Sequence, residues 1–321
     1  MSVEKLKYIY SKIKNYGIIP AIKTSDPDKA VFIAKALSSG GLNIAEIAFD
    51  TENAAESARK ISGAFSEILI AAGNVLTVEQ IKPVVGSGAK IIISKGMNEN
   101  VLSYCENNNI AVIPECLNAD DIEKASEMDI DVVKYYVENI EAVKELSAQY
   151  PNLKFILAGE INGENILDYL SQDQVMACDG SFIIKKEYVQ SHEFDKIQDS
   201  AVQIIRKILG FDLAHVVINC ENAEQAERDA GKIESIFGLE KTDAGASVSN
   251  ADIIHFMKSK SYGKNGQIAI SSNFLDRAVF YLKEAKKQFI EESARFDGDG
   301  KLASIYLDNI IGGFAIKLVR K

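Results

Sequence analysis

The run Ile68-Leu69-Ile70-Ala71-Ala72 is short and continuously apolar, and the polar turn Gly73-Asn74 follows it directly. The same unit, an apolar run, a turn and a helical stretch, recurs through about the first 205 residues. Helices are predicted over 29–37, 99–105 and 138–149, where apolar residues recur three or four positions apart. The apolar runs predicted as strands are Ile18–Ile22, Leu42–Phe49, Ile68–Ala72, Ile91–Ser94, Ala111–Ile113, Asp131–Val133, Lys154–Ala158 and Gln174–Cys178.

These runs predict an α/β fold. Apolar strands that do not alternate with polar residues are typical of a parallel sheet covered on both faces. Eight of them alternating with helices favour a (β/α)₈ barrel, the TIM-barrel fold. An open, doubly wound sheet is the alternative, but no glycine fingerprint for a dinucleotide is found.

The pattern changes near residue 210. The amphipathic stretch Phe194–Leu209 closes the barrel region, and Gly210 interrupts it. A length of 321 residues fits two domains, so we predict boundaries at 1–209 and 210–321. The second domain is predicted as a small α+β domain of two βαβββ modules. The predicted elements are strand 214–219, helix 222–237 and strands near 246–249 and 253–257, then strand 267–271, helix 275–288 and strands 302–307 and 313–319. Residues 296–300 are predicted as a hairpin turn rather than a calcium loop.

Composition narrows the class of protein. The formal charge is −10, which disfavours contact with nucleic-acid phosphates. No apolar run is long enough to cross a membrane or to form a secretion signal, so we expect a soluble protein of the cytoplasm. The four cysteines lie far apart in sequence and are expected to be buried free thiols.

Ionisable and small polar residues gather at the ends of the predicted strands. In a (β/α)₈ barrel the active site lies at the carboxyl ends of the strands, here called the mouth. The strand-end residues are Lys23, Glu46, Asp50, Gly73, Asn74, Lys95, Glu115, Lys134, Gly159, Glu160, Asp179, Gly180 and Ser181.

Lys134 stands out because it directly follows an apolar run and is placed as the last residue of its strand. Partial burial and a neighbouring cation such as Lys95 are expected to lower the pKa of its amine. A neutral amine can form a Schiff base with a ketone, and Glu46 could transfer the protons. Position alone equally allows an ion pair between the two side chains.

At these residues the chain resembles the 2-keto-3-deoxy-6-phosphogluconate / 4-hydroxy-2-oxoglutarate aldolase family, over about residues 5–208. Order and spacing around the barrel carry the resemblance. The matching segments are Ile18-Ile19-Pro20-Ala21-Ile22, Ile44-Ala45-Glu46-Ile47, Ala71-Ala72-Gly73-Asn74-Val75-Leu76, Ile92-Ile93-Ser94-Lys95-Gly96, Val133-Lys134-Tyr135-Tyr136 and Asp179-Gly180-Ser181-Phe182.

The resemblance implies a trimeric class I aldolase that cleaves a 4-hydroxy-2-oxo acid, with pyruvate or glyoxylate-type products, and needs no cofactor. Lys134 would form the imine, and Glu46 would act as general acid and base through water. The residues implied in substrate binding are Asn74, Lys95, Lys23, Glu115, Gly159, Glu160, Gly180 and Ser181.

Several family positions differ. Asp50 replaces an arginine that holds the substrate carboxylate, Asn74 a threonine, Lys95 a proline and Glu115 a glycine. The family's proline-threonine-glycine-glycine phosphate turn corresponds to Leu157-Ala158-Gly159-Glu160, where a glutamate would repel phosphate. We therefore expect an altered substrate, with Lys95 or Lys23 holding a carboxylate. The alternatives are a Schiff-base enzyme for a non-phosphorylated or cationic oxo compound, and a non-catalytic barrel that binds a small acid or serves as a scaffold.

The segment from Asp212 to Lys321 resembles a glyoxalase / vicinal-oxygen-chelate domain. The resemblance rests on 213–216, 266–269 and 312–316. It implies a divalent metal held by His215, His255 and Gln267, with Lys317 at the fourth ligand position. Because a charged lysine cannot ligate, the alternative is a structural or oligomerising domain without metal.

Overall fold

The computed structural model describes residues 3–321, except for the side chains of Val3 and Lys5. The chain divides into two compact units between Ile205 and Arg206. Among the helices of the described chain, none combines the length and apolarity needed to cross a bilayer.

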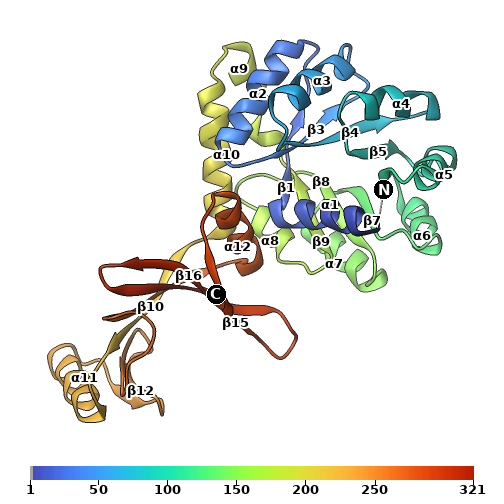
Figure 1. The fold of residues 1–321 in the computed structure, drawn as a ribbon. Coiled ribbons are helices and arrows are strands. Elements are labelled where there is room, and N and C mark those ends of the chain that lie inside the picture. Colours follow the sequence, from blue (N-terminus) through green and yellow to red (C-terminus); the bar gives the residue numbers. More distant parts are fainter. Residues whose placement is uncertain (1–2) are drawn as a thin grey trace. The chain divides into compact units, whose positions relative to one another are not determined.

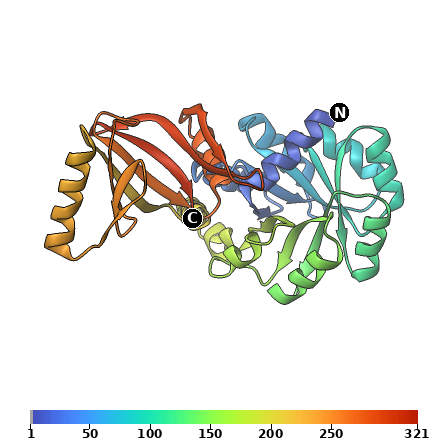
Figure 2. The same cartoon turned by 90° about the horizontal axis from the view of Figure 1, so that it is seen from below.

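The first unit alternates strands and helices, with the helices outside the strands (Figures 1 and 2). Its strands are β1 (Ile18–Ile19), β2 (Ala21–Ile22), β3 (Ile44–Ala48), β4 (Leu69–Val75), β5 (Ile91–Lys95), β6 (Ala111–Cys116), β7 (Val132–Val137), β8 (Lys154–Gly159) and β9 (Val175–Asp179). Its helices are α1 (Val3–Tyr16), α2 (Pro27–Ser39), α3 (Ala54–Ala64), α4 (Val78–Gly86), α5 (Glu99–Asn107), α6 (Ala119–Glu127), α7 (Ile140–Gln149), α8 (Ile166–Leu170), η1 (Ser181–Ile183), α9 (Lys186–Gln190) and α10 (Phe194–Leu209).

The parallel sheet closes on itself through one broken strand. Its order is β1-β9-β8-β7-β6-β5-β4-β3-β2, and β1 and β2 are separated only by Pro20. Proline has no N–H to donate, but its carbonyl accepts the N–H of Glu46 at 2.9 Å. On the other side, β1 pairs with β9 at Ile18↔Cys178. The ring is therefore an eight-stranded (β/α)₈ barrel, as predicted.

Local sequence explains where the helices begin. The side chain of Asp26 caps α2, and Pro27 follows at a position where helices tolerate proline. Asn98, Asn118 and Asn139 each cap the helix that follows a barrel strand by accepting a backbone N–H. The turns at the mouth are thus held by short polar side chains.

Strand β7 is longer than its predicted run, which corrects the placement of Lys134. The strand continues through Tyr135 and Tyr136, which pair with Leu157 and Ala158 of β8. Aromatic residues suit a strand, so pairing does not stop at the lysine. Lys134 therefore lies inside the strand and is 8% exposed, not at its tip. Glu46 likewise lies in the middle of β3.

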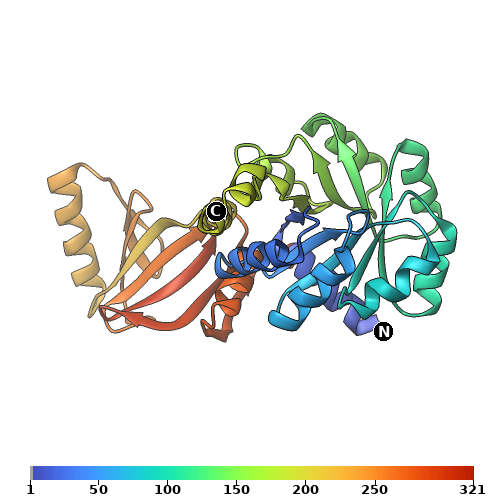
Figure 3. The same ribbon diagram turned by 90° about the horizontal axis from the view of Figure 1, so that it is seen from above.

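The second unit forms one eight-stranded sheet (Figure 3). Its first module comprises β10 (Asp212–Asn219), α11 (Ala223–Phe237), β11 (Lys241–Asp243), β12 (Ser247–Asn250) and β13 (Ile254–Met257). Its second comprises β14 (Gly266–Ser272), α12 (Leu275–Glu284), β15 (Phe289–Phe296), β16 (Leu302–Ile311) and β17 (Phe314–Arg320). The element order is that of two βαβββ modules, which confirms this part of the prediction.

Two strands of this unit are not among the predicted elements. Strand β11 consists of three exposed polar residues, so it has no apolar pattern to find. Strand β15 begins directly after residues predicted as helix, because α12 ends at Glu284 and Lys286 has a left-handed backbone (φ 59°). The hairpin predicted at residues 296–300 is confirmed, since β15 and β16 pair antiparallel at Phe296↔Leu302.

All four cysteines, Cys105, Cys116, Cys178 and Cys220, are buried thiols outside any disulfide. Burial raises the pKa of the Cys105 thiol to about 11 and that of Cys116 to about 12. These thiols are therefore protonated at neutral pH and pack as small apolar side chains, as predicted.

Gly159 is expected to be essential to the fold of the mouth. It adopts φ 138°, and a Cβ there would collide with the carbonyl oxygen of Val137. We predict that Gly159→Ala lowers the free energy of unfolding by about 2 kcal/mol in urea denaturation followed by circular dichroism. The control is Gly63→Ala in α3, where a Cβ meets nothing within 4 Å. It should leave stability unchanged or raise it by up to about 1 kcal/mol. Equal losses in both variants would contradict the prediction.

Candidate active site at the mouth of the barrel

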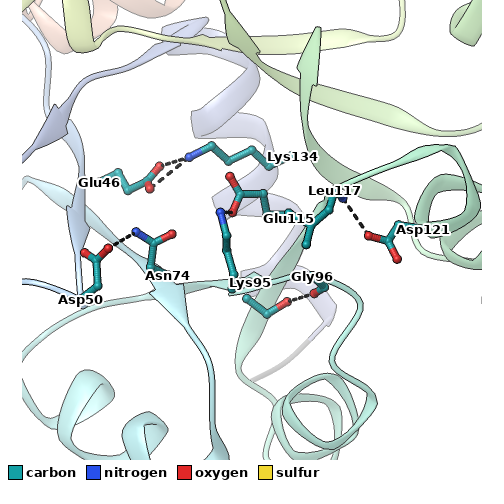
Figure 4. Close-up of polar contacts among 10 residues, drawn as sticks. Glu46, Asp50, Asn74, Lys95, Gly96, Glu115, Leu117, Asp121 and Lys134 are labelled. Atoms are coloured by element: carbon teal, nitrogen blue, oxygen red, sulfur yellow. Dashed lines mark hydrogen bonds and ion pairs between the residues drawn. The ribbon is translucent and has the colours of Figure 1, made fainter.

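Glu46 and Lys134 point toward each other across the barrel from β3 and β7 (Figure 4). The Lys134 Nζ donates to Glu46 Oε2 at 2.8 Å and to Oε1 at 3.1 Å. Both side chains are about nine-tenths buried, with 9% and 10% of their surface exposed. The predicted pair of functional residues is therefore brought together as a close, bidentate ion pair.

The pKa of Lys134 differs from the expected direction. Burial lowers it, but the attraction of Glu46, the hydrogen bond to Glu46 and the charges of Asp179 and Glu115 raise it further, so the net pKa lies above its ordinary value. The expectation of a lowered pKa is wrong because the neighbours of the amine are acids. In the resting protein the amine is charged.

Lys95 does not serve as a cationic neighbour of Lys134. Its Nζ binds Glu115 Oε2 at 2.8 Å instead (Figure 4). Lys95, Glu115 and Lys134 occupy one row of the sheet, since they are register partners on β5, β6 and β7. Glu115 thus lies between two lysines and neutralises part of their charge.

Asp50 and Asn74 form a second polar contact at the mouth. The Asn74 amide donates to Asp50 Oδ2 at 2.9 Å (Figure 4). Asn74 has a left-handed backbone (φ 58°), which asparagine tolerates better than most residues. Asp50, at the position of the family's arginine, is therefore hydrogen-bonded to Asn74, at the position of the family's threonine.

The turn after β9 is closed by its own acid. The backbone N–H of Ser181, a residue that the resemblance implies in substrate binding, donates to Asp179 Oδ1 at 2.6 Å. The buried Ser181 hydroxyl has no hydrogen-bond partner among the described residues. Gly180 is required there because a Cβ would overlap Ile18. Asp179 has this role without being among the predicted site residues, although its strand-end position was the available indication.

A cavity of about 600 Å³ adjoins this turn, and we call it the cationic cavity. It brings together Lys23 and Ser181, both predicted, with Lys29 and Lys186, which the sequence analysis did not single out. One carboxylate, Asp26, lines it, but that side chain caps α2. The cavity therefore offers positive charge to an anionic group.

Gly159 ends β8 and Glu160 follows it, and neither residue joins the contacts described above. Glu160 is exposed, and its backbone carbonyl accepts the Asn165 side-chain amide at 2.9 Å. Within residues 3–321 its carboxylate forms no hydrogen bond or salt bridge with another side chain. The Glu160 carboxylate therefore adds negative charge at the turn after β8, the position of the family's phosphate turn.

The metal predicted for the second unit does not fit its residues. The His215 and His255 rings lie 5.0 Å apart, but both polar ends of Gln267 are engaged: its Oε1 accepts from Tyr306 and its Nε2 donates to Ser261. Burial, His255 and Lys317 lower the pKa of His215, so its surroundings are cationic. In the part of the chain that the structure describes, no group of three His, Cys, Asp or Glu could hold a metal ion.

The first unit is similar in sequence to known proteins. A family model for KDPG and KHG aldolases matches residues 9–200. The 2-dehydro-3-deoxy-phosphogluconate aldolase of Haemophilus influenzae is 34% identical over 193 residues, which cover 59% of this chain and 91% of the relative. The KHG/KDPG aldolase of Escherichia coli K12 is 25% identical over 192 residues, or 59% of this chain and 90% of the relative.

A solved structure agrees. The KDPG aldolase from Legionella pneumophila, with pyruvate captured as a covalent carbinolamine intermediate, aligns with a TM-score of 0.58 and 26% identity, covering 61% of this chain and 97% of that chain. The proteins named in these comparisons are aldolases, which are carbon–carbon lyases. Over residues 9–200, the chain belongs to the KDPG and KHG aldolase family.

Proposed function

We propose that the barrel is a class I aldolase in which Lys134 forms a Schiff base with a 4-hydroxy-2-oxo acid and Glu46 transfers the protons. The observation that carries the proposal is the bidentate contact between the two buried side chains. Covalent capture of pyruvate in a relative of 26% identity supports the same chemistry here.

The ion pair is compatible with this role because its proton can move within it. Glu46 Oε2, 2.8 Å from Nζ, accepts the proton when a ketone approaches and displaces solvent. The neutral amine then attacks the carbonyl carbon to give a carbinolamine, and protonated Glu46 supports the loss of water.

The resulting iminium draws the electron pair of the C3–C4 bond toward itself. That bond breaks as the C4 hydroxyl proton passes to Glu46, and an aldehyde leaves. The remaining enamine takes a proton at C3 and is hydrolysed, which releases pyruvate and restores the pair. Every proton lost by the substrate is thus returned through one carboxylate.

We further propose that the substrate lacks phosphate. Asp179 already occupies the Ser181 N–H, and Glu160 adds negative charge at the β8 turn. The cationic cavity beside Ser181 instead suits the distal carboxylate of an oxo acid, with Lys23 as the predicted contact. A trimeric assembly, a cytoplasmic location and a glyoxalase-like second unit remain parts of this proposal.

The mouth is better described as remodelled than as decayed. Four family departures form two contacts, Asp50 with Asn74 and Lys95 with Glu115. Random loss of function would leave single substitutions with unmatched charges. Matched departures support a retained site with a changed substrate.

Borohydride trapping tests the Schiff base. Pyruvate with borohydride should add one reduced adduct to the Lys134 peptide, detected by mass spectrometry after digestion. Lys134→Arg keeps the charge beside Glu46 but cannot form an imine, so trapping should be lost. Lys90→Arg is the control, since Lys90 is exposed and precedes β5 at the opposite end of the barrel. Glu46→Gln should slow trapping by about 100-fold. An adduct elsewhere, or none in the wild type, refutes the proposal.

The stability of the ion pair can be measured by a double-mutant cycle. Lys134→Met leaves a buried carboxylate without its partner and should lower the free energy of unfolding by about 3 kcal/mol. Lys134→Met with Glu46→Leu should recover to within about 1 kcal/mol of the wild type. Since the folded pKa of Lys134 is raised, the pair's contribution is complete below the ordinary value of 10.5 and is lost as the pH rises through the folded value. Additive single losses in the cycle would show that the contact is not coupled.

The substrate class can be tested by competition between acceptors. With pyruvate as donor, kcat/KM should be higher for glyoxylate than for glyceraldehyde 3-phosphate. Asp179→Ala removes the acceptor of the Ser181 N–H together with its negative charge, so the ratio should move about tenfold toward the phosphorylated aldehyde. Asp199→Ala on the exposed face of α10 should leave the ratio unchanged. Preference of the wild type for the phosphorylated aldehyde would reject a non-phosphorylated substrate while leaving the Schiff base intact.

A further inference from the structure

One face of the C-terminal sheet carries a cluster of basic side chains. The register partners His215, Ala269, Lys317 and Tyr306 form one row across β10, β14, β17 and β16. The adjacent row contains His255, Val217 and Gln267. Residues directly opposite each other on paired strands share a face, so these side chains emerge together.

This face is the one turned away from α11. The alternate residues of the same strands, Ile218, Val248 and Phe256, pack against Ala226 and Ala230 of that helix. Because side chains alternate along a strand, the row of His215 and the row of His255 lie on the other side. Arg295 on β15 is the register partner of Ser304, which lies two residues before Tyr306 on β16, so it is on this side as well. We call the set His215, His255, Lys317 and Arg295 the basic face.

The basic face has no matching acid. Among the described residues, no carboxylate forms a salt bridge with any of its four members, and the Arg295 guanidinium donates only to the backbone carbonyls of Glu292 and Ala294. Asp252 contacts His255 through its backbone carbonyl, while its carboxylate accepts the Ser249 hydroxyl. Burial and Arg295 both lower the pKa of Lys317. Half-buried positive charge without a counterion is unfavourable, so an anion would be stabilised here.

An ordered scaffold holds the centre of the face. The Tyr306 hydroxyl donates to Gln267 Oε1 at 2.5 Å, and Gln267 Nε2 donates to Ser261 Oγ at 2.9 Å. Tyr262 stacks on Tyr306 with ring centroids 4.5 Å apart, and Lys317 Nζ lies 5.5 Å from the Tyr306 centroid. Val217 and Ala269 lie between the charged groups but are buried beneath their neighbours. A small carboxylate held by the surrounding cationic side chains matches this arrangement.

We propose that the basic face binds a small organic carboxylate without a metal, with Lys317 and Arg295 contacting the carboxylate and His215 and His255 completing the site. Lys317, which lies at the fourth position of the resembled metal site, would then bind the anion. This site is independent of the proposed chemistry at Lys134.

The three histidines of the chain allow a direct test. Malonate is a suitable probe because it has no ketone and cannot form an imine with Lys134. In the full-length protein at constant ionic strength, malonate should saturably shift the imidazole NMR signals of His215 and His255 with one common midpoint. His192 lies two residues after Gln190 of the cationic cavity and reports any binding there separately, so Lys23→Met should leave the shifts of His215 and His255 unchanged. The same shifts are expected in Lys134→Arg, which separates this site from the barrel.

Substitutions of Lys317 test its contact with malonate. Lys317→Met should weaken malonate binding about tenfold or more, and Lys317→Arg, which keeps the charge, should restore much of it. Lys232→Met on α11, whose amine pairs with Asp229 on the opposite side of the sheet, is the matched control and should bind as the wild type does. The His192 signal before malonate is added and circular dichroism report whether each variant is folded.

Other outcomes overturn the proposal. Non-saturable shifts, equal shifts of all three histidines, or undiminished binding in Lys317→Met would show that the face has no carboxylate site. A response to inorganic phosphate but not to malonate would reject the ligand class. Tight one-to-one shifts with Zn²⁺ and none with malonate would restore the metal hypothesis.

Discussion

The contact between Lys134 and Glu46 is the constraint on which the barrel depends. Two charges nine-tenths buried in one interior must meet, since either one alone would remain without compensation. The neighbouring backbone is built around that requirement. Gly73 on β4 has no Cβ, and a Cβ there would collide with Glu46 Oε1. Extension of β7 beyond Lys134 places the amine inside the barrel rather than at its rim.

Periodicity is sufficient to predict the barrel and, apart from β11 and β15, the strands and helices of the two βαβββ modules, because apolar strands and amphipathic helices are local patterns. Periodicity does not predict how deeply Lys134 is buried or in which direction its pKa is shifted. The apolar run that ends at Val133 predicts Lys134 at a strand tip, whereas pairing of Tyr135 with Leu157 carries the strand onward. The direction of its pKa depends on Glu46, Asp179 and Glu115, which come from other strands. Lys29 and Lys186 share a cavity only because the ring closes.

The departures from the family pattern make sense once they are seen in space. Along the chain, Asp50 and Glu115 are acids where an arginine and a glycine are expected, which suggests a damaged site. In the structure each is bonded to another departing residue, Asn74 or Lys95. Asp179 closes the turn after β9 by the same kind of internal contact, with the Ser181 N–H. The carboxylates of Asp50, Glu115 and Asp179 each accept a hydrogen bond at the mouth, and lysines line the cationic cavity.

In the second unit the residues that depart from the resembled pattern are basic rather than acidic. Its imidazoles stand where the resemblance places metal ligands, but Lys317 and Arg295 make their surroundings positive and Gln267 is bound to Tyr306 and Ser261. A divalent cation would add charge to a face whose four basic members form no salt bridge within residues 3–321, whereas an anion would offset that charge. We therefore infer that Lys317, by its place in a row of strand partners, makes this sheet favour an anion over a divalent cation.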